Sequence, residues 1–254
     1  MQLKKQCIDA DRLLIADLTN EKFNKHNVCA RKNRVISRFI NLYKAPISID
    51  DAMKHSLVIS IDKKRYIEMC KLFRSYGFVT IPDILFGSTF KDKSGQFNCK
   101  HSHMRAVQYA KENKWPYVLI FEDDAYPCDN IIDKFSSYLY ALPKDALLVL
   151  FGWSNSCAQD FSKPFNKITE TAISGSHAYM VFESAYDRFI SYHKANPKKS
   201  ADNTVFKTIS PSYVIDYPLF IQHTNEKSMN GHVGFAYYGN HKTPPVGFSL
   251  KEVH

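Results

Sequence analysis

The stretch Tyr117-Val-Leu-Ile-Phe121, followed directly by Glu122-Asp-Asp-Ala125, decides how this sequence is expected to fold. Five consecutive apolar residues are typical of a strand buried on both faces, as in a parallel sheet covered by helices. Three adjacent carboxylates at the end of such a strand repel one another unless a positive group lies among them. The pattern therefore predicts a cation site, with loop capping and solvated surface charge as the alternatives.

The three carboxylates would favour a hard divalent cation. Oxygen ligands select Mg²⁺ or Mn²⁺ over zinc. If the chain stays extended beyond Phe121, residues two apart point to the same side, so Glu122 and Asp124 would face one way and Asp123 the other. Open α/β sheets bind ligands beyond the carboxyl ends of their strands, which places this acidic triplet in a favourable position for binding.

The rest of the chain alternates between strand and helix patterns. Strands are predicted at 57–61, 78–81, 117–121, 147–151, 178–182, 213–217 and 219–222. Helices are predicted at 63–75, 102–113, 129–142 and 183–194, with a loop at 86–98 and a loop-like tail from 224. This alternation indicates an α/β fold in which a mixed or parallel sheet is covered on both faces.

The charge is unevenly distributed along the chain. Its 254 residues hold 34 Lys and Arg against 25 Asp and Glu, which gives a net charge of +9 and favours anionic partners. Ten basic and five acidic side chains fall within residues 1–50, where 34–42 has the pattern of a short amphipathic helix. We therefore expect residues 1–50 to form a basic accessory segment with helical character and residues 51–254 to form one domain.

The cysteines and apolar runs bear on the cellular compartment. Six cysteines contain no CxxC pair, which argues against a zinc knuckle or a redox motif. The N-terminus shows no apolar signal segment, and the longest apolar run is far below the roughly 20 residues of a membrane span. We expect a cytoplasmic protein with reduced thiols.

Several motifs together resemble glycosyltransferase family 25, which includes bacterial lipooligosaccharide galactosyltransferases and collagen galactosyltransferases. The central block of that family is similar to Cys99-Lys-His-Ser-His103, a helix, an apolar strand and Glu122-Asp-Asp124. Ser174-Gly-Ser-His-Ala-Tyr179 and Pro218-Leu-Phe-Ile-Gln222 resemble its later blocks, and the likeness covers roughly 56–225. One departure is Asn98, which stands where the family has glycine.

The resemblance implies a GT-A fold, with a Rossmann-type mixed sheet flanked by helices, and a glycosyltransferase catalytic domain at 51–254. It further implies a UDP-sugar donor, with galactose as the expected sugar, Mn²⁺ or Mg²⁺ as cofactor, and inversion at the anomeric carbon. The acceptor would be an oligosaccharide of a lipopolysaccharide-type, lipid-linked or surface glycan.

The resemblance also implies roles for individual residues. Glu122, Asp124 and His223 would hold the metal, although a histidine at a strand end is often an ordinary surface residue. Inversion needs a general base, for which Asp202 and His177 are the candidates. The alternatives are a helix cap at Asp202 and simple packing at His177.

The donor would contact a larger set of side chains. Ser102 and His103, expected at a helix N-terminus that attracts anions, would lie near the sugar or the diphosphate. The full set of expected donor-binding residues is Asp62, Arg65, Ser102, His103, Asp123, Gly175 and Tyr179.

Two other functional classes remain open on the sequence. A nucleotidyltransferase or phosphoester hydrolase could use the same carboxylates, with a second metal about 3.5–4 Å from the first. A non-catalytic glycan- or nucleic-acid-binding protein would follow from the charge, but basic and aromatic residues are not interleaved, so nucleic acid is not expected as a partner. The basic segment is either a peripheral contact to the inner face of the membrane or a solvated helical hairpin.

Overall fold

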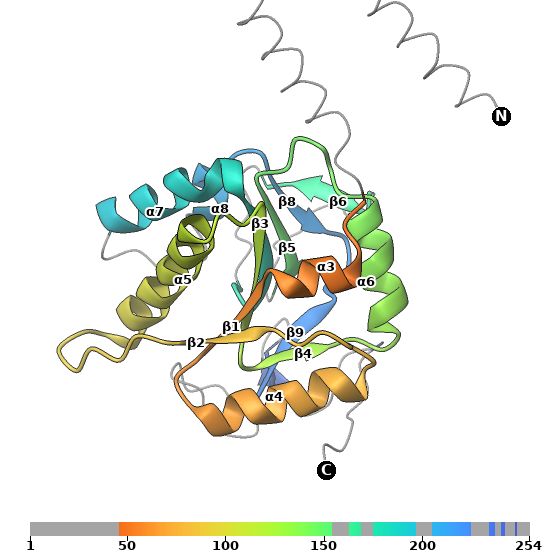
Figure 1. Cartoon of the computed structure of the whole chain (residues 1–254), viewed down its shortest axis with the longest axis horizontal. Coiled ribbons are helices and arrows are strands. Elements are labelled where there is room, and N and C mark those ends of the chain that lie inside the picture. The colour runs from red at the N-terminus through yellow and green to blue at the C-terminus, as the bar shows by residue number, and fades with distance from the viewer. Residues whose placement is uncertain are drawn as a thin grey trace, which may run out of the picture. The chain divides into compact units, whose positions relative to one another are not determined.

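The computed structural model in Figure 1 describes residues 46–153, 163–168, 175–196, 205–224, 234–236, 240–241 and 247. Most of the basic segment, with its predicted helix at 34–42, lies outside these residues. The first described helix, α3 (Ile49–Lys54), begins at the N-cap Ser48, whose side chain accepts a hydrogen bond from the backbone N–H of Asp51. This helix spans the predicted boundary between the accessory segment and the main domain.

One mixed sheet forms the centre of the described chain. Its strands are β1 (Ser56–Ser60), β2 (Asp83–Phe86), β3 (Tyr117–Glu122), β4 (Ala125–Pro127), β5 (Leu148–Gly152), β6 (Phe165–Lys167), β7 (Ala178–Phe182), β8 (Ser212–Ile215), β9 (Phe220–Thr224), β10 (Gly234–Ala236) and β11 (Asn240–His241). The main order is β11-β10-β9-β5-β7-β3-β1-β2, while β4 pairs with β9, and β8 pairs with β5 and β6. β1 runs parallel to β2 and β3, whereas β7 is antiparallel to β3 and β5.

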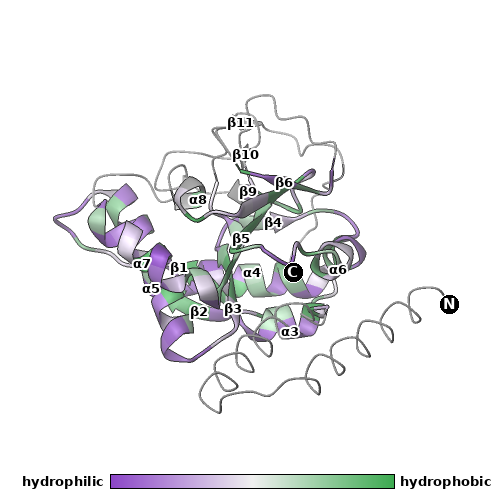
Figure 2. Cartoon of the chain, turned by 90° about the horizontal axis from the view of Figure 1, so that it is seen from above, coloured by the Kyte–Doolittle hydropathy of each residue, from purple (hydrophilic) through white to green (hydrophobic). Residues whose placement is uncertain are grey.

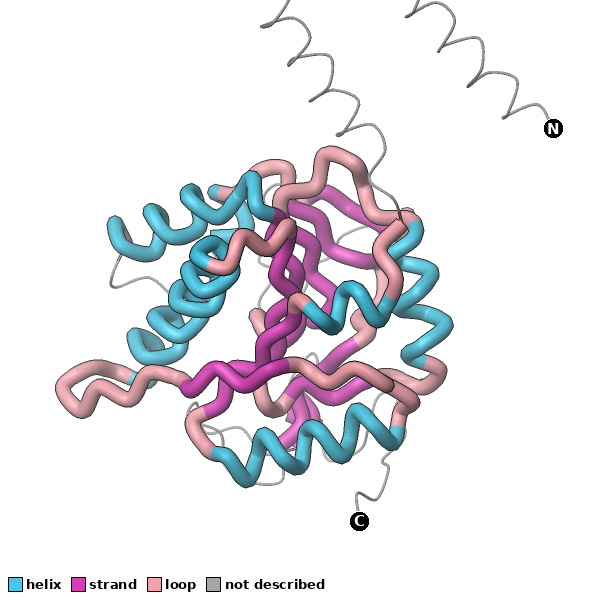
Figure 3. The backbone as a smooth tube through the Cα atoms, in the orientation of Figure 1, coloured by secondary structure: helices cyan, strands magenta, loops and turns pink. Residues whose placement is uncertain are grey.

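Helices cover both faces of this sheet. They are α4 (Lys63–Ser75), α5 (Gly95–Glu112), α6 (Ile131–Tyr140), the 3-10 turn η1 (Glu183–Ala185), α7 (Tyr186–Ala195) and α8 (Val205–Thr208). Figures 1 and 3 show α5 and α7 on one side of the strands and α3, α4 and α6 on the other. The predicted α/β class is thereby confirmed: a mixed sheet flanked by helices.

The core divides into two layers because the side chains of β3 alternate between the faces. Leu119 and Phe121 pack with residues of α3, α4 and α6, whereas Val118 and Ile120 pack with residues of α5 and α7. All four are fully buried, and the strands at the centre of the sheet are hydrophobic in Figure 2. A continuous apolar run is what a strand with two covered faces requires.

Local signals explain helix α4. Asp62 caps its N-terminus by accepting a hydrogen bond from the backbone N–H of Lys64 at 2.8 Å. Gly77 follows its end at φ 95°, a conformation that glycine adopts without steric cost. The predicted helix at 63–75 is confirmed to the residue.

Three predictions differ from the structure by more than the end residues of an element. No strand forms at 78–81; the strand is β2, which begins at Asp83. α5 begins at Gly95 rather than near 102, because Ser94 caps it with a hydrogen bond from the N–H of Phe97. The tail contains the short strands β10 and β11, which extend the sheet beyond β9. Among the described residues, no helix has the length and apolar character needed to cross a membrane.

Candidate functional site

The acidic triplet lies at the carboxyl edge of the two parallel strands β1 and β3. Ile59 of β1 pairs with Glu122, so Ser60 and Glu122 end these strands side by side. β3 ends at Glu122, and Asp123 and Asp124 form a turn into β4. The expectation of an extended chain through the triplet is therefore wrong, because β4 has to leave β3 to pair with β9. The turn directs the three carboxylates to different surroundings.

Asp123 is held by two groups from the first βα unit. Its Oδ2 accepts a hydrogen bond from Ser60 Oγ at 2.5 Å, and its Oδ1 lies 2.5 Å from Arg65 Nη2. Burial raises the pKa of Asp123, although Ser60 and the Arg65 charge act in the opposite direction. Arg65 and Asp62 were both expected to bind the donor. In the structure, Arg65 has Asp123 as its partner, and Asp62 serves as the cap of α4.

Glu122 connects three elements. Its Oε1 accepts a hydrogen bond from Ser176 Oγ at 2.6 Å, and its Oε2 accepts one from Gln222 Nε2 in β9 at 3.2 Å. His103 Nε2 of α5 lies 3.2 Å from Oε1, close enough for an ion pair. Burial alone would raise the pKa of Glu122, but His103 and Ser176 lower it to about 2. Glu122 is therefore an ionised carboxylate inside the fold.

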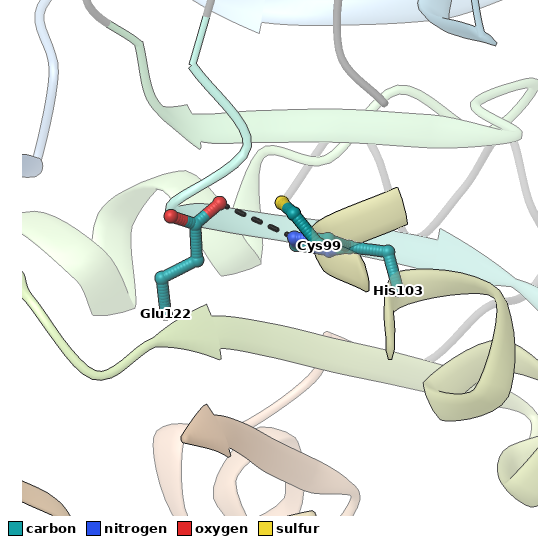
Figure 4. A group of neighbouring side chains, drawn as sticks. All are labelled: Cys99, His103 and Glu122. Carbon is teal, nitrogen blue, oxygen red and sulfur yellow. Dashed lines mark ion pairs between the residues drawn. The ribbon is translucent and has the colours of Figure 1, made fainter. Parts of the chain in front are cut away.

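His103 lies in the middle part of helix α5, two turns past the first residue of the helix. It is 1% exposed, and its Nδ1 is 2.8 Å from the Tyr179 hydroxyl. Burial acts to lower its pKa, but Tyr179, Cys99 and Glu122 outweigh that effect and raise the pKa well above the usual value. The imidazolium form is thus stabilised by its surroundings. Figure 4 shows His103 beside Glu122 and Cys99.

Ser102 lies within α5, not at its N-terminus, and its hydroxyl connects the helix to the preceding loop. Its Oγ donates to the carbonyl of Asn98 at 2.7 Å and accepts the N–H of Ser88 at 2.8 Å. The side chain is 2% exposed. The anion-binding argument made for Ser102 and His103 fails, because α5 begins at Gly95 and its free backbone N–H groups lie in the first turn.

Asp124 is the carboxylate that lacks a full set of partners. Its Oδ1 is buried and has no hydrogen-bond partner among the described residues. Burial raises the pKa of Asp124 to about 8, and the charges of Glu122 and Asp123 add to the rise. Such an oxygen beside two further carboxylates fits a divalent cation, which would offset the repulsion among the carboxylates and be coordinated by this oxygen.

The remaining predicted site residues are distributed as follows. Gly175, at φ 103°, directly precedes the Ser176 that binds Glu122. His177 is fully buried, and its Nε2 donates to the carbonyl of Phe220 at 2.9 Å, an arrangement that favours packing over proton abstraction from a substrate. Asp202 lies outside the described residues. His223 pairs with Phe235 between β9 and β10, and its side chain lies outside the described part.

Sequence reasoning missed four side chains of this site: Ser60, Cys99, Ser176 and Gln222. The pairs Ser60–Asp123, Ser176–Glu122 and Gln222–Glu122 are separated by 63, 54 and 100 positions, respectively. No local spacing rule reaches across such separations. The available signals were indirect, since Cys99, Ser176 and Gln222 fall inside the quoted family-like blocks and Ser60 ends the first strand.

The sequence matches no family profile and no curated protein. The resemblance to family 25 therefore rests on the quoted motifs alone.

Several solved structures are similar in fold over much of the chain. A197 from STIV is 9% identical over 75% of this chain and 97% of its own, with a TM-score of 0.43. A glycosyltransferase involved in the glycosylation of the major capsid of PBCV-1 is 15% identical over 63% and 79%, with a TM-score of 0.42. 4-Diphosphocytidyl-2C-methyl-D-erythritol synthase from Anaerococcus prevotii DSM 20548 is 11% identical over 69% and 92%, with a TM-score of 0.39. Likeness at this level carries no activity over to this chain.

Proposed function

We propose that this chain is a metal-dependent glycosyltransferase that uses a nucleotide-sugar donor. The observation that carries the proposal is Oδ1 of Asp124, which is buried and has no hydrogen-bond partner within the described ranges. It lies beside Glu122 and Asp123 at the carboxyl edge of parallel strands. This is where open α/β sheets bind their ligands. Mn²⁺ or Mg²⁺ suits the oxygen donors of the cluster.

Two carboxylates of the triplet would hold the cation. Asp124 offers its free oxygen, and Glu122 offers Oε2, which faces Gln222 and not His103. A divalent cation held by these two carboxylates would supply positive charge to a nucleoside diphosphate leaving group. Asp123 is engaged with Ser60 and Arg65, so its role is to fix the turn between β3 and β4. His223 remains the candidate for a third ligand.

The chain has to supply a base for the acceptor hydroxyl if the reaction inverts the anomeric carbon. His177 is poorly placed for this task because it is fully buried and its Nε2 is bonded to Phe220. Asp202 is therefore our candidate for the base. Asp202→Asn should lower kcat by roughly 10²–10⁴-fold with little change in donor binding. A variant with undiminished kcat would exclude Asp202 from this role.

The finer assignments follow from the motifs that resemble family 25. On that basis the donor is UDP-galactose, and the acceptor is an oligosaccharide of a lipopolysaccharide-type or other surface glycan. A panel of nucleotide sugars, tested for metal-dependent hydrolysis and thermal shift, would check the donor. A response to nucleoside triphosphates alone would instead favour a nucleotidyltransferase.

The cation assignment is tested by Asp124→Asn, which keeps the side-chain shape and removes the charge. We expect the variant to fold, as judged by circular dichroism, and to lose the Mn²⁺-dependent binding of UDP in calorimetry. Asp133→Asn, on the exposed face of α6, is the matched control and should bind UDP as the parent does. Unaltered Mn²⁺-dependent binding of UDP by Asp124→Asn would contradict the cation assignment.

A further inference from the structure

A second group of metal-binding side chains lies beside the acidic triplet. Cys99 and His103 are four residues apart on α5, so they share one face of the helix, and Glu122 faces them from the end of β3. Their ligand atoms, Sγ, a ring nitrogen and a carboxylate oxygen, all lie within 4.8 Å of one another. We propose that Cys99, His103 and Glu122 form a zinc site. The proposal does not depend on the transferase function.

The spacing of the group fits tetrahedral coordination. Zinc binds nitrogen and oxygen at about 2.0–2.1 Å, so two such ligands stand roughly 3.3 Å apart in a tetrahedral site. His103 Nε2 and Glu122 Oε1 are 3.2 Å apart in the metal-free chain. The Cys99 thiol completes three protein ligands with small side-chain adjustments. Because Cys99 and Glu122 are only half-buried, the fourth position is open to water or to a bound molecule.

The contacts of the two ring nitrogens of His103 are those expected of a metal ligand. Nε2 of His103 is buried at the centre of the group, at ion-pair distance (3.2 Å) from Glu122 Oε1, and has no hydrogen-bond partner among the described residues. Nδ1 is bonded to Tyr179 on the opposite side of the ring. A metal-binding histidine is usually oriented in this way, by a second partner that fixes its ring and tautomer. Without the ion, a proton on Nε2 can occupy its place and hold Glu122 by charge.

The ligand types distinguish this site from the proposed Mn²⁺ or Mg²⁺ site. A thiolate and an imidazole favour zinc, whereas Asp124 and Glu122 Oε2 offer hard oxygens. Glu122 would serve both sites, with Oε1 toward His103 and Oε2 toward Gln222. Zinc binding would displace the proton from His103 Nε2 and deprotonate Cys99, and both protons would pass to solvent.

Titration of the untagged, full-length chain with Zn²⁺ tests the proposal. We expect the parent chain, with the Cys99 thiol intact, to bind one zinc ion. When Co²⁺ replaces Zn²⁺, we expect a cobalt–thiolate charge-transfer band. Cys99→Ser should abolish that band, while Cys70→Ser, a half-buried cysteine on α4, should leave it unchanged. Tyr179→Phe should weaken zinc binding about 10–100-fold, as the loss of an orienting partner does.

Two further measurements separate the outcomes. Asp124→Asn should retain zinc binding although it loses Mn²⁺-dependent UDP binding, so the two sites can fail independently. If Cys99→Ser does not fold, protection of the Cys99 thiol from alkylation by Zn²⁺ in the parent chain gives the same answer by peptide mass spectrometry. Absence of the cobalt–thiolate band in the folded parent, or equal alkylation of Cys99 with and without zinc, would overturn the proposal.

Discussion

Gly152, the last residue of β5, lies against the ring of His177. A Cβ at this position would stand 2.5 Å from His177 Cδ2 and 3.0 Å from the backbone oxygen of Phe220. Neither neighbour can move easily, because His177 is bonded to that same oxygen. Gly152→Ala should therefore destabilise the fold by about 1–3 kcal/mol, as overpacking of a core does. Urea denaturation measures the change.

Gly87 offers the control for this prediction. A Cβ there would meet Ile61 Cγ2 at 2.9 Å, but the Ile61 side chain is 44% exposed and can rotate away. Gly87→Ala should lower the free energy of unfolding much less than Gly152→Ala does. Equal losses of stability in the two variants would show that the contact with His177 is not the reason why position 152 requires glycine.

His193 of α7 is buried, and neither ring nitrogen has a hydrogen-bond partner among the described residues. Burial, together with the charges of His103 and Lys100, lowers its pKa from 6.5 to about 3. The folded state therefore binds this proton less readily than the unfolded chain. The neutral ring contributes stability that is complete above about pH 6.5 and is lost as the pH falls toward about 3, by up to about 1.4 kcal/mol per pH unit.

His193→Leu removes this titration while keeping an apolar side chain among Phe189 and its neighbours. Between pH 7.5 and pH 5, the parent should lose roughly 2 kcal/mol more unfolding free energy than the variant. Urea denaturation at both pH values measures the difference, and titrating groups that do not interact with His193 contribute equally to both chains. An identical pH dependence would mean that His193 titrates normally in the folded protein.

At the scale of elements, Asn98 links helix α5 to the loop before it. Its Oδ1 accepts the N–H of Phe90 at 3.0 Å, and its Nδ2 donates to the carbonyl of Phe90 at 3.1 Å. Asn98→Leu would leave the N–H of Phe90 unpaired and would remove one of two hydrogen bonds to its carbonyl, which also accepts the N–H of Lys93 at 3.3 Å. We expect a loss of about 1–3 kcal/mol and faster hydrogen exchange at the Phe90 amide. Asn166→Leu, which removes one exposed local hydrogen bond, should have little effect; unchanged exchange at Phe90 in Asn98→Leu would contradict the prediction.

The same contacts explain why the start of α5 was not predicted. The stretch 86–98 is polar and contains two glycines, so its composition indicates a loop. The structure shows a helix start instead: Ser94 caps α5, and within the same region Asn98 holds Phe90 and Ser102 holds Ser88. For α4, the cap Asp62 and the terminating Gly77 directly flank the periodic stretch 63–75, so its bounds were predictable.

At the scale of the whole molecule, the charge is concentrated at the N-terminus. Removal of residues 1–45 deletes ten basic and four acidic side chains, so the net charge falls from +9 to +3 and α3 keeps its Ser48 cap. We propose that this segment contacts anionic membrane surfaces, where each basic residue contributes about 1 kcal/mol. The full chain should co-sediment with anionic vesicles at low salt, and the shortened chain should not. Neutral vesicles are the control, and equal binding of both chains would remove the segment from this role.

The sequence by itself determined the α/β class, the buried strand β3 and the placement of the acidic triplet at its end, because apolar runs and charge patterns are local. The partners of each carboxylate were decided only by the tertiary structure. Asp123 meets Ser60 and Arg65, and Glu122 meets His103, Ser176 and Gln222. Asp124 retains a buried oxygen that has no partner in the part of the chain that the structure describes. The physical reason is the pairing of β4 with β9, which bends the chain after Glu122 and turns three neighbouring side chains toward groups distant in the sequence.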